Sequence, residues 1–168
     1  GIRGLNSLGM ACDCYREAYE IYIEIYGPES DSAGECITKL ADSLRAQGRF
    51  DEAATTYLEA IAATPKVNDN DEKLAWLYTS LSIVCSEFGR WSDELRFQLE
   101  ALPLMQRACG EHINTETMFN NLGYICRSQG DRSGARRYYT LALDLCRRLG
   151  GDNGARIAKY TKALKNLN

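Results

Sequence analysis

The sequence lacks several features that would mark an enzyme, a metalloprotein or a membrane protein. It contains one histidine, His112, which excludes a histidine-based catalytic triad and a zinc site built from several histidines. No Cys-x-x-Cys pair occurs, and Gly150-Gly151 precedes only a loop and a helix cap rather than forming a phosphate loop. Uncharged runs fall far short of the roughly 18 residues that cross a bilayer. We therefore predict no catalytic residue, no cofactor, no metal site and no membrane span, and we interpret His112 as a loop cap.

Cysteine and proline usage points to a folded chain in a reducing compartment. Three prolines in 168 residues do not suggest disorder. Seven cysteines at irregular spacings make a poor disulfide framework, because one is left without a partner. Free cysteine packs like a small apolar residue. No basic and apolar signal peptide opens the chain. We predict a cytoplasmic location.

The charge distribution is uneven along the chain. Residues 1–72 carry 14 acidic and 6 basic side chains, whereas residues 73–168 carry 9 acidic and 14 basic ones. In an elongated molecule this asymmetry makes one end acidic and the other end basic. The basic excess is densest after Arg127 and could serve a partner or solubility alone. Aromatic and basic residues do not interleave as in nucleic-acid modules, so the sequence does not favour nucleic-acid binding.

An internal repeat with a period of 41 residues organises the chain. Gly48, Gly89 and Gly130 each begin a similar short motif at that spacing. Each glycine is preceded and followed by apolar residues at helical spacing, and it occupies the place where a helix end needs a left-handed residue. The apolar faces before the glycines comprise Ile37, Leu40, Ala41 and Leu44, then Tyr78, Leu81, Ser82 and Cys85, then Phe119, Leu122, Gly123 and Cys126. Those after the glycines comprise Ala53, Tyr57, Ala60 and Ile61, then Leu95, Leu99, Ala101 and Leu102, then Ala135, Tyr139, Ala142 and Leu143.

These periods predict an all-α fold, a right-handed α-solenoid of antiparallel helix hairpins with about eight helices. One array fills residues 1–168, with a leading half-repeat at 10–26, repeats at 33–65, 71–109 and 113–150, and a capping helix at 154–166. Because the chain starts in mid-repeat, we expect a fragment of a longer protein. Pro103 predicts a kink or a break near Leu102. Asp152-Asn153 is the expected N-cap of the last helix.

The repeat resembles the tetratricopeptide family, and its long period resembles the kinesin light chain variety. The resemblance rests on Gly110-Glu-His112 and on Phe119-Asn-Asn-Leu-Gly123, which is followed by Ser128-Gln-Gly130. The sequence departs from the family where Ile113 replaces a proline, where Thr64-Pro65-Lys66 replaces the glycine loop, and where Glu94 replaces an alanine. The resemblance implies a protein-interaction module of an adaptor or scaffold, whose first helices line a concave groove.

Side chains beside the core stripe of the first helices are the candidate groove residues. Trp76, Ile83 and Tyr124 would anchor a partner because building the hairpins does not require them. Paired asparagines can bond an extended backbone, and arginines would favour an acidic ligand residue. The family's carboxylate clamp is not predicted, because only one of its expected positions matches. The candidates are Thr38, Asp42, Arg45, Trp76, Thr79, Ile83, Asn120, Asn121, Tyr124 and Arg127.

Two functions remain open on the sequence. In the first, the groove binds a peptide or segment of a partner protein. In the second, the chain is an architectural or regulatory segment that stacks on further repeats or domains of its parent chain and has no ligand of its own.

Overall fold

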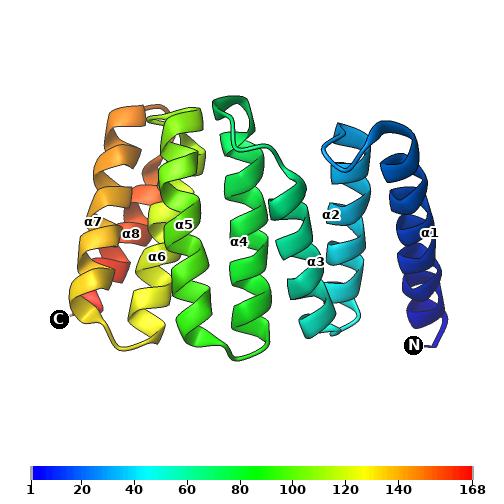
Figure 1. The fold of residues 1–168 in the computed structure, drawn as a ribbon. Helices are drawn as coiled ribbons and strands as arrows, with labels where there is room; N and C mark the ends of the chain where they lie inside the picture. The colour runs from blue at the N-terminus through cyan, green and yellow to red at the C-terminus, as the bar shows by residue number, and fades with distance from the viewer. Residues whose placement is uncertain (1, 168) are drawn as a thin grey trace.

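The computed structural model describes residues 2–167, with side chains from residue 9, and every regular element in that range is a helix. Figure 1 shows α1 to α7 following one another in chain order from the blue N-terminus, with the red α8 behind α6 and α7. The predicted all-helical solenoid is therefore confirmed. The elements are α1 (Ile2–Tyr26), α2 (Asp31–Ala46), α3 (Phe50–Ala63), the 3-10 helix η1 (Asn68–Asn70), α4 (Asp71–Glu87), α5 (Trp91–Cys109), α6 (Ile113–Ser128), α7 (Arg132–Leu149) and α8 (Gly154–Lys165).

Three helix hairpins, α2–α3, α4–α5 and α6–α7, are stacked between α1 and α8. Each helix packs mainly on its neighbours in the chain, as expected of a repeat protein. Gly48, Gly89 and Gly130 close the three hairpins with φ angles of 75°, 78° and 82°. Only glycine adopts this left-handed conformation without strain, so the glycines that define the sequence period also define the hairpin turns.

The buried face of α5 differs from the predicted one. Leu99 is 42% exposed, whereas Glu94 and Gln98 are 5% and 2% exposed. Glu94 and Gln98 follow Ala53 and Tyr57 by 41 residues, and all four are buried. The repeat register therefore decides which side of α5 faces inward. The assignment of Leu99 to the core is wrong, whereas Leu95 is partly buried and packs against the core cluster that contains Tyr139. In the first and third hairpins the predicted apolar faces are buried.

Two local predictions at helix ends and interiors also need correction. The helix α5 continues from Trp91 to Cys109 through Pro103, so of the predicted kink or break near Leu102 the break does not occur. Pro103 has no backbone N–H to donate to the Leu99 carbonyl. Both residues lie on the exposed side of the helix, where water can reach that carbonyl. Asn153 occupies the N-cap position of α8 but makes no side-chain cap bond; its Nδ2 instead donates to the Cys146 carbonyl.

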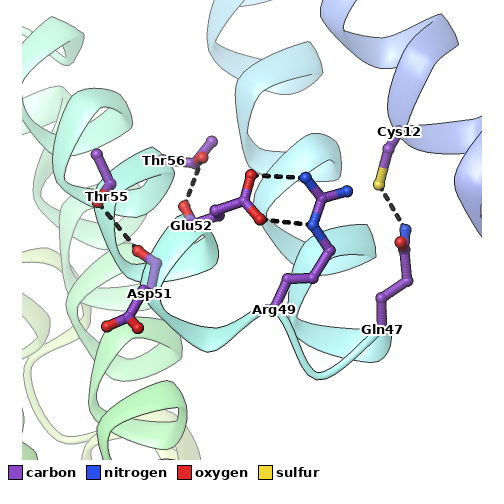
Figure 2. Close-up of polar contacts among 7 residues, drawn as sticks. All are labelled: Cys12, Gln47, Arg49, Asp51, Glu52, Thr55 and Thr56. Carbon is purple, nitrogen blue, oxygen red and sulfur yellow. Dashed lines mark hydrogen bonds and ion pairs between the residues drawn. The ribbon is translucent and has the colours of Figure 1, made fainter.

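The turn between α2 and α3 also holds α1 in place (Figure 2). The Arg49 guanidinium donates from Nε and Nη2 to the two carboxylate oxygens of Glu52, both at 2.6 Å. Gln47 Nε2 donates to Cys12 Sγ at 2.7 Å, which links the turn to α1. The Arg49–Glu52 pair is exposed and lies within the hairpin, so it does not reach α1. The Gln47 hydrogen bond and the packing of buried Cys12 in the core therefore hold α1.

A buried carboxylate holds α8 against α6. Glu116, 1% exposed, accepts from Arg156 Nη1 at 2.6 Å and from the Tyr160 hydroxyl at 2.7 Å. Burial, together with the hydrogen bond to Glu116, raises the pKa of Tyr160, which keeps the phenol protonated as the donor. Because both partners come from α8, this cluster sets the position of the last helix and of the lysines it carries.

Four of the seven cysteines, Cys12, Cys85, Cys126 and Cys146, are buried like apolar core residues, whereas Cys14 is exposed and Cys36 and Cys109 are partly buried. Cys85 and Cys126 occupy the slot that Leu44 fills in the first hairpin, and they are 2% and 3% exposed. Burial raises the pKa of both thiols, which keeps them in the unreactive neutral form. His112 also has a local role, since its Nδ1 accepts from the Asn114 backbone N–H at the start of α6.

Candidate functional site

Two adjoining hollows lie along the first helices of the C-terminal half. The polar hollow, about 280 Å³, is formed by α4, α5 and α6 and is lined by Thr79, Ser82, Ile83, Ser86, Glu87, Glu94, Gln98, Asn121, Tyr124 and Ile125. The basic hollow, about 290 Å³, is formed by α6, α7 and α8 and is lined by Asn120, Asn121, Tyr124, Arg127, Tyr139, Lys159, Lys162, Ala163 and Asn166. They share Asn121 and Tyr124, so together they form one groove across α4, α6 and α8.

Six of the ten candidate residues line this groove. Ile83 and Tyr124 occupy equivalent positions of successive repeats and are 45% and 54% exposed. Thr79 is buried, and its hydroxyl donates to the Ala75 carbonyl at 2.9 Å, so little of it is available to a ligand. The remaining three line the hollow nearer α8: Asn120, Asn121 and Arg127.

The other four candidates lie outside the two hollows. The Thr38 hydroxyl donates to the Gly34 carbonyl within its own helix. Asp42 accepts from the Tyr57 hydroxyl, and burial with this hydrogen bond raises the pKa of Tyr57. Arg45 pairs with Glu87 across α2 and α4 at 3.0 Å, so its charge is already offset within the chain. Trp76 is 42% exposed on α4, about two turns before Ile83.

The basic hollow carries three cationic side chains and no carboxylate in its lining. Arg127 comes from α6, whereas Lys159 and Lys162 come from α8. None of the three makes an ion pair with another side chain in the described part of the chain. The Arg127 guanidinium lies 5.3 Å from the centre of the Tyr124 ring, a cation–π distance. The hollow therefore presents positive charge beside an exposed aromatic ring.

Tyr139 lies in the lining of the basic hollow because Gly123 leaves space for it. A Cβ built on Gly123 would lie 2.7 Å from the nearest atom of the Tyr139 ring. The two helices of this hairpin therefore approach closely at Gly123. The sequence analysis placed Tyr139 only on the apolar face of its helix, and it assigned residues 154–166, which include these lysines, only to a capping helix.

The polar hollow contains two buried polar atoms with no hydrogen-bond partner among the described residues, Glu94 Oε2 and Gln98 Nε2. Glu94 and Gln98 occupy the repeat positions that Ala53 and Tyr57 hold in the first hairpin. In the third hairpin Ala135 and Tyr139 hold the same positions. Glu94 stood out in the sequence as a departure from the family pattern, but Gln98 did not. Carrying the 41-residue register through α5 would have found both residues.

Other types of functional site find no support in the described range. No group of three or more histidine, cysteine, aspartate or glutamate side chains in that range could hold a metal ion. No helix within it is long and apolar enough to cross a membrane.

Comparison with known proteins agrees with the repeat architecture. One tetratricopeptide repeat profile matches residues 6–66 and again 40–107, and a second matches 115–154. The structure of BtubC (BKLC) from P. vanneervenii has a TM-score of 0.72 and 25% identity over 98% of this chain. This chain spans 64% of the length of BtubC.

A second similar structure confirms the fold alone. It is a Podosopora anserina kinesin light chain-like protein with nearly identical TPR-like repeats, with a TM-score of 0.80 and 12% identity. The match covers 96% of this chain and 78% of the other. No functionally curated protein matches the sequence significantly. The family profiles cover most of the chain, and the chain belongs to the tetratricopeptide repeat family.

Proposed function

We propose that the chain is a non-catalytic protein-interaction module that binds a segment of a partner protein in the groove across α4, α6 and α8. The observation that carries the proposal is the basic hollow, whose three cations have no carboxylate beside them. An acidic side chain of the partner would supply the missing negative charge. Tetratricopeptide repeats generally serve protein interaction, and the proposal is consistent with an adaptor or scaffold role.

The exposed apolar side chains of the groove would provide most of the binding energy. Ile83 and Tyr124 lie on successive first helices, and Trp76 extends the same line along α4. Large side chains that close over a partner and exclude water are the usual hot spots of protein interfaces. Asn121 borders both hollows, where its amide can donate to and accept from the backbone of a segment that crosses between them.

Selection from a displayed library of random linear peptides tests this proposal. We expect the wild-type chain to enrich peptides that place an acidic residue near apolar ones. Lys159→Glu/Lys162→Glu should abolish that enrichment. Arg136→Glu/Arg137→Glu is the matched control, since it makes the same change of charge on exposed residues of α7 that do not line the groove. Binding by the control should remain at the wild-type level.

Two further variants separate binding from folding. Asn121→Ala and Arg127→Ala should lower the free energy of unfolding by no more than about 1 kcal/mol, because neither side chain is fully buried. The same substitutions should weaken binding of a selected peptide by about 1–3 kcal/mol if the contacts are desolvated. If every variant binds like the wild type, or if no peptide is enriched, the groove does not bind a partner and the architectural alternative replaces it.

A further inference from the structure

The polar hollow of the middle hairpin combines a buried acceptor with a buried donor. Glu94 and Gln98 are one helical turn apart on α5, so their side chains lie on one face of the helix. They are 5% and 2% exposed, yet Glu94 Oε2 and Gln98 Nε2 have no hydrogen-bond partner among the described residues. Buried polar groups in proteins are nearly always paired, so a partner from outside the chain is required.

The repeat register shows that hairpin packing does not require these two residues. The first hairpin builds the same position from Ala53 and Tyr57, and the third from Ala135 and Tyr139. All four residues are buried, and none of them has a buried side-chain nitrogen or oxygen atom without a hydrogen-bond partner. In the middle hairpin the shorter Gln98 replaces the aromatic ring, and a hollow opens toward the groove at this place. Polar substitutions of core positions are typical of functional sites rather than of scaffolds.

We propose that the polar hollow is a specificity pocket for a carboxamide side chain, glutamine or asparagine, of the bound segment. The inference rests on the proposed function, because the segment is the one that lies in the groove. A carboxamide carries two N–H donors and one carbonyl acceptor. Its N–H donates to Glu94 Oε2, and its carbonyl accepts from Gln98 Nε2. Both unpartnered atoms are satisfied by a single neutral side chain.

Aliphatic and charged ligand side chains satisfy at most one of the two atoms. An aliphatic side chain pairs with neither, and a carboxylate places a second negative charge beside Glu94. Lysine and arginine donate to Glu94 but cannot accept from Gln98, because neither has an acceptor. A volume of about 280 Å³ leaves space for a long side chain. The position of Asn121 in both hollows places this pocket next to the basic one on the path of the segment.

The test uses the same displayed library of random linear peptides, selected on the full chain and on Glu94→Ala/Gln98→Tyr. This variant copies the residues of the first and third hairpins, so it should fold as they do. Wild-type selection should enrich glutamine or asparagine at one fixed distance from the acidic residue. The variant should keep the acidic residue, because the basic hollow is untouched, and lose the carboxamide preference.

Affinities of one synthesised peptide then measure the discrimination. In the most enriched peptide, the glutamine or asparagine is replaced by methionine or by glutamate. Either replacement should weaken binding to the wild-type chain by about tenfold or more, because each leaves buried polar groups of the pocket unpaired. On Glu94→Ala/Gln98→Tyr the three peptides should bind within about threefold of one another, since 0.6 kcal/mol corresponds to that ratio.

Each contrary outcome identifies what failed. Peptides enriched in acidic residues without a carboxamide overturn the pocket and leave the proposed function standing. Enrichment of arginine or lysine instead overturns the carboxamide assignment, because Gln98 would then present its oxygen to the ligand. A library that yields no binder on the wild type overturns the groove function and the pocket together.

Discussion

The free energy of unfolding should rise when the polar pair of α5 is replaced by the residues of the neighbouring hairpins. The perturbation is Glu94→Ala/Gln98→Tyr, which copies Ala53 and Tyr57 of the first hairpin. It removes two buried atoms that have no hydrogen-bond partner among the described residues. It also fills the hollow with an aromatic ring.

The expected magnitude follows from the two unpartnered atoms. Leaving a buried polar group unsatisfied costs about 1–3 kcal/mol, so removing both should stabilise the chain by about 2–6 kcal/mol. Tyr57 lies in one core cluster with Ala41, and Ser82 takes the place of Ala41 in the middle hairpin. Crowding of the new ring by this slightly larger side chain costs about 1 kcal/mol or more. A net gain of about 1–5 kcal/mol remains, which raises the melting temperature by about 2–20 °C for a chain of this size.

Urea unfolding followed by far-UV circular dichroism measures the change, with thermal unfolding as a second probe. Leu99→Ala is the matched control on the same helix, because Leu99 is 42% exposed and its loss should change stability little. A double variant that is no more stable than the wild type would refute the reasoning. In that case water satisfies both atoms in the free protein, and the repeat register does not define the best packing of α5.

Three further predictions concern the core and its thiols. Gly123→Ala should destabilise the chain by about 1–3 kcal/mol in urea unfolding, because its Cβ would lie 2.7 Å from the Tyr139 ring; a gain, as helix propensity alone predicts, would contradict this packing. Glu116→Ala should lower the free energy of unfolding by about 3–5 kcal/mol, since it leaves the buried Tyr160 hydroxyl and the Arg156 charge unpaired; an unchanged urea midpoint would show that the cluster does not hold α8. In a thiol-reagent assay at neutral pH, exposed Cys14 should react first and Cys85 only after unfolding, because burial raises its pKa; equal rates would contradict the buried position.

The sequence by itself was sufficient to predict the helical hairpins and the family. Hairpin turns are local events, and the glycines at 48, 89 and 130 specify them through a left-handed conformation that few other residues adopt. The spacing of apolar residues specifies helices in the same local way. Because each repeat contacts only its neighbours, a local pattern that recurs is enough to define the whole array.

Part of the candidate groove was also within reach of the sequence. Ile83 and Tyr124 were identified because they flank the core stripe of first helices without belonging to it, and the structure places both in the groove. Arg45 satisfied the same criterion but pairs with Glu87 of the next hairpin. The sequence periodicity within one helix carries no information about which side chains meet between hairpins.

Only the tertiary structure decided what lines the groove beside α8, whereas the 41-residue register of the sequence already specified which face of α5 is buried. Hydrophobicity favoured Leu95 and Leu99, but neighbouring hairpins impose a common register and turn Glu94 and Gln98 inward. The lysines of α8 join the groove because the buried Glu116 cluster fixes that helix against α6. Helix formation depends on near neighbours in the chain, so the sequence determined it. The surroundings of each groove side chain depend on contacts between elements distant in the chain, so the tertiary structure decided them.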